Sequence, residues 1–228
     1  MKPTIQLAET RTPAGRRLVL AQHDRDFNLM DEGYPLMTSR EHESELELAR
    51  LGCAHSASRP APRVLIGGLG MGYTLRQTLD LFPPSATVVV AELLPDIVEW
   101  NRVYLGDLTD HPMRDERVTV KVCDVVDVVR KNAHPFDAIL IDIDNGPEAI
   151  SDYQDHALYS TAGIGMLMRA LTAAGCLAIW SAGIDRRFER RLRREGLHVK
   201  AFQVPAHKGA KARSKCIWVA SRDPNSLP

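Results

Sequence analysis

The sequence predicts an α/β protein with a doubly wound, Rossmann-like, seven-stranded and mostly parallel sheet, preceded by a small β-rich lid. Apolar strand patterns alternate with helical patterns from residue 63 to residue 222, and a glycine-packed turn joins the first of these strands to its helix. The first 38 residues instead hold short β-rich pieces separated by turns. A chain of 228 residues can bury roughly 70% of its unfolded surface, which is enough for one such core with an appendage.

The N-terminal residues 4 to 38 are expected to form the antiparallel lid. Their β-rich pieces are Ile5 to Thr10, Arg17 to Gln22 and Phe27 to Met30, with turns at Pro13-Ala14-Gly15 and Asp31-Glu32-Gly33. A glutamate-rich helix is expected over residues 40 to 52, followed by a linker of Ser, Pro and Ala. We therefore expect residues 1–55 to form the lid and its linking helix, and residues 56–228 to form a nucleotide-binding catalytic domain.

The second segment alternates strands and helices. The expected strands are Arg63 to Ile66, Thr87 to Ala91, Val118 to Val122, Ala138 to Ile141, Cys176 to Trp180, Val199 to Val204 and Cys216 to Ala220. The expected helices are Gly72 to Leu81, Pro95 to Leu105, Val125 to Lys131, Gly163 to Ala173 and Arg186 to Glu195. Continuous apolar runs are typical of strands that helices cover on both faces, and such sheets bind ligands at the carboxyl ends of their first strands.

The glycine-packed turn follows the first of these strands. Glycines tolerate positive φ and let the backbone approach a ligand closely, while the helix that follows offers unpaired N–H groups. We expect four glycines to cradle a nucleotide: Gly67, Gly68, Gly70 and Gly72. Tyr73 stands where dinucleotide-binding folds need their third glycine, so the spacing favours an adenosylmethionine-type ligand over NAD.

Polar residues follow the next two strands. Glu92 ends the strand that begins at Thr87, at the position where a carboxylate would bind the two hydroxyls of a ribose. Asp124 and Val125 follow the third strand and would place a carboxylate or a backbone amide beside an adenine ring. A glycine turn and an acid at a strand end also occur in α/β proteins that bind no nucleotide, and this alternative stays open.

Acidic residues crowd the end of the fourth strand. Asp142 and Asp144 are two positions apart, so they share a face if the strand persists. Such a pair can hold a cationic amine and accept its proton, which is the task of a transferase with an amine nucleophile. The alternative is that Asp144 or Asn145 caps the turn made by Gly146-Pro147.

Four further residues are candidate substrate contacts. His42 and Glu43, with Glu45 close by, lie at the junction of the expected lid and core. Asn145 lies in the acidic segment, and Tyr159 follows it on a stretch long enough to act as a gate. The alternative for these residues is a solvated or hydrogen-bonded surface position.

Composition narrows the classes of partner. The 29 basic and 29 acidic residues balance, so we expect no nucleic acid partner, and the arginines of residues 186 to 194 surround an apolar stripe as on an ordinary surface helix. The four cysteines have no metal-ligand spacing, and no metal is expected. No apolar run approaches the roughly 18 residues of a membrane span, so no membrane partner is expected and the chain is typical of a cytoplasmic protein.

The chain resembles the spermidine/spermine synthase family of polyamine aminopropyltransferases, which has a fold of the S-adenosylmethionine-methyltransferase type. The matching segments occur in the family's order: Leu29 to Gly33 and then Thr38, His42-Glu43, Leu65 to Gly68 through Thr74-Leu75-Arg76, Glu92 with Pro95, Asp115-x-Arg117-Val118, Asp124, Phe136-Asp137 to Asp142, and Leu158-Tyr159-Ser160. The resemblance implies that Glu92 binds the ribose, Asp124 the adenine, and Asp142 the acceptor amine or its proton.

Two positions differ from that family. Gly70 stands where the family's loop carries an aspartate that holds the aminopropyl amine, and Asp142-Ile143-Asp144-Asn145-Gly146-Pro147 replaces the family's D-S-S-D-P signature. Many methyltransferases carry an acid two positions before the first glycine of their loop, where this chain has Ile66. Neither family's amine-binding acid is therefore present. Asp142, Glu43 and Glu45 are the candidates to hold that amine instead, and the alternative is that the donor tail is bound differently.

The resemblance implies transfer of an aminopropyl-type group from a decarboxylated or intact S-adenosylmethionine donor to a small-molecule amine acceptor. Asp142 would be the catalytic base, with help from Asp144. Methyl transfer from S-adenosylmethionine is the alternative that Gly70 favours, and a non-catalytic adenosyl-nucleotide-binding protein is the alternative that the altered acidic signature favours. The oligomeric state is open, with a homodimer as one option.

Overall fold

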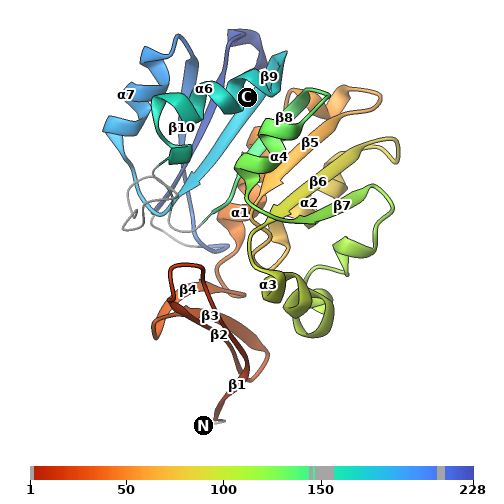
Figure 1. Ribbon diagram of the computed structural model, residues 1–228, viewed down its shortest axis with the longest axis vertical. Helices are drawn as coiled ribbons and strands as arrows, with labels where there is room; N and C mark the ends of the chain where they lie inside the picture. The colour runs from red at the N-terminus through yellow and green to blue at the C-terminus, as the bar shows by residue number, and fades with distance from the viewer. Residues whose placement is uncertain (1–2, 144–145, 147–156, 210–213) are drawn as a thin grey trace.

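The computed structural model describes residues 3–143, 146, 157–209 and 214–228. Two sheets make up this part of the chain, a four-stranded antiparallel sheet at the N-terminus and a seven-stranded sheet beyond it (Figure 1). This arrangement confirms the expected fold class.

The N-terminal sheet has the order β1-β2-β3-β4, with every neighbouring pair antiparallel. Its strands are β1 (Thr4–Arg11), β2 (Arg17–His23), β3 (Asp26–Asp31) and β4 (Tyr34–Thr38). The first three confirm the sequence prediction. The fourth was not predicted, because it is short and contains Pro35, and a proline is tolerated only at the edge of a sheet.

The large sheet has the order β10-β11-β9-β8-β5-β6-β7. Its strands are β5 (Arg63–Gly67), β6 (Thr87–Glu92), β7 (Val118–Val122), β8 (Phe136–Ile141), β9 (Leu171–Ser181), β10 (His198–Val204) and β11 (Lys215–Ser221). Among these strands, β11 runs in the direction opposite to the other six, so its pairings with β10 and β9 are antiparallel and all other pairings are parallel. Because β5 lies between β6 and β8, the strand order reverses at β5, and such a switch point opens a crevice for a ligand.

Helices cover both faces of this sheet. They are α1 (Glu43–Cys53), α2 (Tyr73–Leu81), α3 (Pro95–Trp100), α4 (Val125–Lys131), α6 (Thr161–Arg169) and α7 (Arg186–Arg194). A π-helical segment, Asn101–Leu105, continues α3. Short 3₁₀ turns are Ser56–Ser58, Gly106–Leu108, Pro112–Arg114 and Pro224–Ser226.

One helix prediction was too long. The helix expected over Gly163 to Ala173 ends at Arg169, because Leu171 already begins β9. Leu171 pairs with Phe136 of β8, and the Phe136 N–H donates to the Ala170 carbonyl at 2.8 Å. Pairing with the buried strand β8 therefore determines the conformation from Leu171 onwards, although the sequence pattern there is compatible with a helix.

Two apolar clusters fill the space between the sheet and its helices. Val64 and Ile66 of β5 point to the face that α1, α2 and α3 cover, while Leu65 between them points to the face of α4, α6 and α7. Helix α1 lies very close to the sheet, since a Cβ atom on Gly52 would come 2.3 Å from Leu140 Cδ2. This packing fixes α1, and with it Glu45, against the strands that carry the site.

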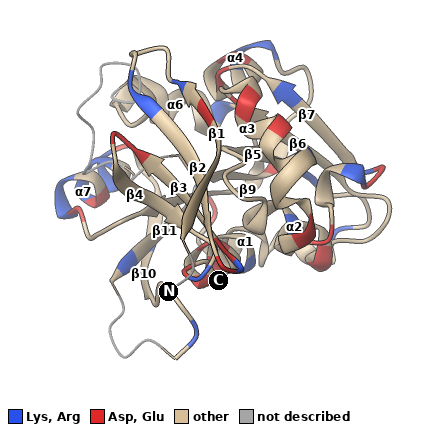
Figure 2. Cartoon of the chain, turned by 90° about the horizontal axis from the view of Figure 1, so that it is seen from below, with Lys and Arg blue, Asp and Glu red and all other residues tan. Residues whose placement is uncertain are grey.

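The arginine-rich helix α7 is an ordinary surface helix, as the sequence predicts. Phe188 and Leu192 are buried, and Arg193 pairs with Glu189 at 2.9 Å. Lys and Arg residues make up much of this helix, which lies at one edge of the molecule (Figure 2). Among the described residues, no helix is both long and apolar enough to cross a membrane.

Candidate active site

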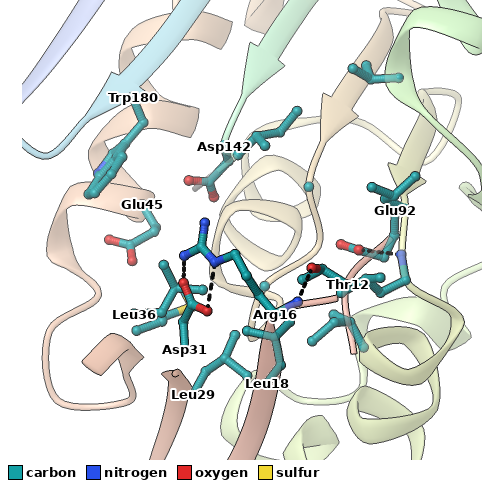
Figure 3. A pocket seen from close by; sticks show the side chains of 18 of the residues that line it. Thr12, Arg16, Leu18, Leu29, Asp31, Leu36, Glu45, Glu92, Asp142 and Trp180 are labelled. Carbon is teal, nitrogen blue, oxygen red and sulfur yellow. Dashed lines mark hydrogen bonds and ion pairs between the residues drawn. The ribbon is translucent and has the colours of Figure 1, made fainter. Parts of the chain in front are cut away.

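A cavity of about 380 Å³ lies where the N-terminal sheet meets the carboxyl ends of the parallel strands (Figure 3). The N-terminal sheet contributes mainly apolar side chains to its wall, among them Leu18, Leu29, Leu36 and Met37. The large sheet contributes the glycine turn and a series of acids, namely Gly68, Gly70, Glu92, Asp124 and Asp142. The cavity thus has an apolar lid side and a polar core side.

The glycine turn adopts a backbone that other residues would strain. Gly68 has φ +93°, and a Cβ atom there would lie 2.2 Å from the Asp142 carbonyl oxygen. Gly70 has φ +51°, and its carbonyl accepts a hydrogen bond from Asn101 Nδ2 at 2.8 Å. The bare backbone of the turn therefore lines the cavity, as expected for a surface that a nucleotide approaches closely.

Glu92 lies at the end of β6, where the sequence predicts a ribose ligand. Its side chain is 7% exposed and lines the cavity. One carboxylate oxygen accepts from the Leu69 N–H at 2.9 Å, and the other accepts from the Leu94 N–H at 2.9 Å. These bonds fix the carboxylate beside the glycine turn and leave lone pairs for hydroxyl groups of a ligand.

Asp124 lies at the end of β7 and is the N-cap of α4. Its side chain accepts a hydrogen bond from the Val126 N–H at 2.8 Å. Asp124, Val125 and Cys123 all line the cavity. Val125 also packs against the glycine turn, because a Cβ atom on Gly67 would come 3.0 Å from Val125 Cγ2.

Asp142 follows β8 directly and faces the cavity. Its Oδ2 atom accepts a hydrogen bond of 2.6 Å from the Thr74 hydroxyl on α2. Burial raises the pKa of this carboxyl above its ordinary value, although the Thr74 bond opposes the rise. A carboxylate with a raised pKa in a cavity can take up a proton from a bound group.

Glu45 brings a second carboxyl group to the cavity, from α1. Its side chain is 5% exposed and accepts a 2.5 Å hydrogen bond from the Ser44 hydroxyl. Burial raises the pKa of Glu45, and the negative charge of Asp142 raises it further, while the positive charge of Lys215 lowers it. Figure 3 shows Glu45 and Asp142 pointing into the cavity from different elements.

Basic and aromatic groups complete the wall. Lys215 Nζ lies 5.3 Å from the centre of the Trp180 ring, and both residues line the cavity. From the lid, Arg16 Nε donates to Asp31 at 3.1 Å, and a second guanidinium nitrogen forms an ion pair with the same carboxylate. Figure 3 shows this Arg16–Asp31 pair inside the cavity.

Met37 of the lid fills the space beside Gly70. A Cβ atom on Gly70 would lie 3.1 Å from Met37 Sδ and 3.3 Å from Met37 Cε. A thioether therefore lies next to the position where the resemblance implied an amine-binding aspartate. An ammonium group of a ligand would find its anionic partners elsewhere in this cavity.

The structure brings seven of the predicted site residues to the cavity wall and places others outside it. Those on the wall are Gly68, Gly70, Glu92, Asp124, Val125 and Asp142, together with the unassigned candidate Glu45. Gly67 and Gly72 shape the turn from behind the wall. The predicted residues Asp144 and Asn145 lie outside the described part of the chain.

Three predicted substrate residues have other surroundings. His42 stacks on Tyr73, with ring centres 4.2 Å apart, and its Nδ1 lies 2.8 Å from the Ser39 carbonyl oxygen. Glu43 forms an ion pair with Arg50 at 3.2 Å. Tyr159 is 2% exposed and packs edge-on against Phe188. None of these three side chains lines the described cavity.

Several residues of the wall and its surroundings were not predicted. Trp180 and Lys215 line the cavity, Thr74 donates to Asp142 from α2, and no spacing in the sequence connects the three. Asn101 holds the glycine turn from the segment after α3. Among the described residues, no three acids, histidines or cysteines cluster as metal ligands would.

The fold and the cavity define the class of protein. A seven-stranded sheet of this order, with a nucleotide-type cradle at its switch point, is the S-adenosylmethionine-methyltransferase type of α/β fold. Residues 50–182 match the spermine/spermidine synthase domain, which is more than half of the chain. The protein therefore belongs to the spermine/spermidine synthase family.

Curated relatives carry the name polyamine aminopropyltransferase. Those from Mycobacterium tuberculosis strains CDC 1551 / Oshkosh and ATCC 25618 / H37Rv are each 27% identical over 173 residues, covering 74% of this chain. The aligned part is 31% of each relative, so the chain matches about a third of their length.

Solved structures of spermidine synthases share the fold. The enzyme from Thermotoga maritima superposes with a TM-score of 0.71 at 18% identity, covering 98% of this chain and 76% of that one. A spermidine synthase in complex with the transition-state analogue AdoDATO gives a TM-score of 0.70 at 18% identity, covering 98% and 75% of the two chains. These likenesses support the architecture, including the N-terminal sheet.

Proposed function

We propose that the protein is a transferase that moves an aminopropyl-type group from a decarboxylated S-adenosylmethionine donor to a small-molecule amine acceptor. The observation that carries this proposal is the position of Asp142, a carboxyl group of raised pKa that faces the same cavity as Glu92 and the glycine turn. Membership of the spermine/spermidine synthase family and the names of the curated relatives support the same chemistry.

The cavity suggests one order for the two substrates. Asp124 and Val125 would lie beside the adenine, and Glu92 would lie beside the ribose hydroxyls. The bare protein backbone at Gly68 would let the donor approach closely. The donor tail would then point past Gly70 towards the end of β8, where Asp142 lies. An acceptor amine held by Asp142 would meet the reacting carbon there.

The transfer itself is an in-line displacement. The lone pair of the neutral acceptor amine forms the new N–C bond, and the C–S bond of the sulfonium breaks with its electron pair going to sulfur. The sulfur leaves as a neutral thioether, methylthioadenosine, and the positive charge passes to the product amine. Asp142 orients the amine and takes the proton that an ammonium must lose first.

Positioning is expected to supply much of the rate enhancement. The sulfonium is already an activated leaving group, and holding two reactants in line can contribute about 7 to 11 kcal/mol. The mainly apolar side chains of the lid would exclude water from the reacting atoms. A closed, dry cavity also suppresses hydrolysis of the donor.

The test is a titration of the purified protein with decarboxylated and with intact S-adenosylmethionine, followed by product analysis with putrescine as acceptor. We expect tighter binding of the decarboxylated donor, because Glu45 and Asp142 would repel the extra carboxylate, and release of methylthioadenosine. Tighter binding of the intact donor with formation of adenosylhomocysteine would contradict the proposal.

Methyl transfer is the second candidate, and the surroundings of Gly70 favour it. Met37 rather than an acid lies beside Gly70, so one anchor of the aminopropyl group is missing. Product analysis separates the candidates, since a methyltransferase yields adenosylhomocysteine. Binding of a donor without either product would leave a non-catalytic nucleotide-binding protein.

A further inference from the structure

Glu45 and Asp142 are two carboxyl groups that face one cavity. Each accepts a hydrogen bond from a neighbouring hydroxyl, Ser44 to Glu45 at 2.5 Å and Thr74 to Asp142 at 2.6 Å. Neither carboxyl group forms an ion pair with any residue in the part of the chain that the structure describes. Buried carboxylates are ordinarily paired, so this pair is costly for the fold unless a cationic ligand compensates it.

The neighbouring glutamates of α1 show the contrast. Glu43 and Glu47 both pair with Arg50, at 3.2 and 2.5 Å. Glu45 lies between them in sequence but on the opposite, buried side of the helix, facing the cavity. Arg50 of α1 thus forms ion pairs with these two glutamates, whereas no basic residue of α1, a helix that the structure describes in full, forms an ion pair with Glu45.

A second, independent polar group at the wall lacks a partner. Trp180 is 8% exposed, and its buried indole N–H has no hydrogen-bond partner among the residues that the structure describes. Trp180 lines the same cavity, and Lys215 is close enough to interact with both Trp180 and Glu45. An indole N–H needs an acceptor, which an ammonium group lacks but the lone pair of a deprotonated amine provides.

We propose that Glu45 is a second acid of the acceptor site, which binds the acceptor's ammonium group together with Asp142 and shares the proton that this group gives up. The inference rests on the proposed function and extends it to a residue of α1, outside the strand end that carries the family's acidic signature. Glu45 touches the substrate in this arrangement and is a catalytic residue in that sense.

The surrounding charges set the protonation of the pair. Burial raises the pKa of both groups, and the charge of each acid disfavours ionisation of the other. Lys215 favours the ionised form of Glu45, and Tyr73 lies near Glu45. The other titratable or charged residues on the described cavity wall are Arg16, Asp31, Glu41, Glu92, Cys123 and Asp124. The two carboxyl groups are therefore expected to share one proton more readily than to ionise together.

The proton balance of the step follows from this state. An entering ammonium favours the doubly ionised pair, so one proton leaves to solvent on binding. The pair then takes one proton from the ammonium, which leaves a neutral amine for attack on the donor carbon. With that proton the pair is back in its one-proton state. The neutral amine then forms the N–C bond while the C–S bond breaks, and the positive charge of the sulfonium passes to the product amine.

The experiment is calorimetric titration of putrescine into the full chain at neutral pH, in buffers of different ionisation enthalpy. The wild type should release close to one proton for each diamine bound. Glu45→Gln should bind putrescine at least tenfold more weakly and release far less proton, because a single acid is already ionised before binding. Glu47→Gln is the matched control on the same helix and should behave as the wild type.

A conservative variant tests whether the effect depends on the acid itself. Glu45→Asp keeps a carboxyl group and should restore part of the proton release, whereas a purely structural Glu45 would give equal release in the wild type and in Glu45→Gln. That equality, or a wild type that binds no putrescine, would overturn the inference. Proton-coupled binding without methylthioadenosine formation would instead refute the proposed function and leave the two-acid site standing.

Discussion

The two ends of the cavity differ in how their polar groups are satisfied. At the donor end, Glu92 and Asp124 accept hydrogen bonds from backbone N–H groups of the turn and helix beside them. At the proposed acceptor end, Glu45 and Asp142 accept hydrogen bonds from the Ser44 and Thr74 hydroxyls, and within the described residues the Trp180 N–H has no partner. The first set is held rigidly by the fold, whereas the second set is left for a ligand to complete.

This difference indicates that one end of the cavity is suited to binding the donor and the other end to proton transfer. A carboxylate held by backbone amides is stabilised in its charged form and is suited to hold neutral hydroxyl groups. A buried carboxyl with few partners has a raised pKa and can exchange a proton near neutral pH. We therefore expect variants of the donor end to change donor affinity, and variants of the acceptor end to change turnover.

The largest effect is expected for Asp142→Asn. The asparagine keeps the shape and a hydrogen bond with Thr74 but cannot take a proton. Turnover should fall by roughly 10² to 10⁴, as for loss of a positioned base, while the donor dissociation constant changes little. Steady-state kinetics and donor titration on the same preparation measure both quantities.

If Asp142→Asn weakened donor binding as much as it slowed turnover, the two ends of the cavity would not have the separate roles proposed for them. Asp137 provides the control, because it lies on the same strand at the opposite end, where it pairs with Arg59 at 2.7 Å. Asp137→Asn should leave turnover per folded molecule unchanged and should reduce only stability. Thermal unfolding of both variants separates the two effects.

A smaller effect is expected for Glu92→Ala. Removing this carboxylate takes charge-assisted partners from the ribose hydroxyls, which should weaken donor binding by about 1 to 3 kcal/mol. Calorimetry with an adenosyl ligand measures the change, and Glu99→Ala on the exposed side of α3 is the control, since Glu99 is a surface partner of Arg102. Unchanged affinity in a folded Glu92→Ala protein would remove Glu92 from the donor site.

The donor end could be predicted from sequence because it depends on local order along the chain. A strand, a glycine turn and a helix place Gly68, and the carboxyl ends of parallel strands must meet at one edge, so Glu92, Asp124 and Asp142 were expected close together, and all three line the cavity. The strands and helices of the core followed from the same patterns. The prediction failed where strand pairing determines the secondary structure: Leu171 was predicted in a helix but pairs with β8, and β4, which pairs with β3, was not predicted.

The acceptor end could be predicted only in part. Glu45 stands among other glutamates on one helix, and the sequence does not show that it alone packs inward against the sheet. Trp180 and Lys215 come together through the antiparallel pairing of β9 and β11, which depends on contacts far apart in sequence. Patterns of spacing report local geometry and contain no signal for such pairs.

The smallest effect concerns stability and its dependence on pH in Glu45→Gln. Because the pKa of Glu45 is raised from 4.5 to about 8, the folded chain binds this proton more tightly than the unfolded chain does. The free energy of unfolding of the wild type should therefore fall as pH rises from 4.5 towards 8, while below 4.5 both states are protonated and Glu45 contributes no slope. Glu45→Gln should lose this dependence and be more stable than the wild type at pH 8 by on the order of 1 to 2 kcal/mol. Urea unfolding at several pH values, with Glu47→Gln as control, measures the difference, and a Glu45→Gln protein less stable than the wild type at pH 8 would show that Glu45 supports the fold instead of straining it.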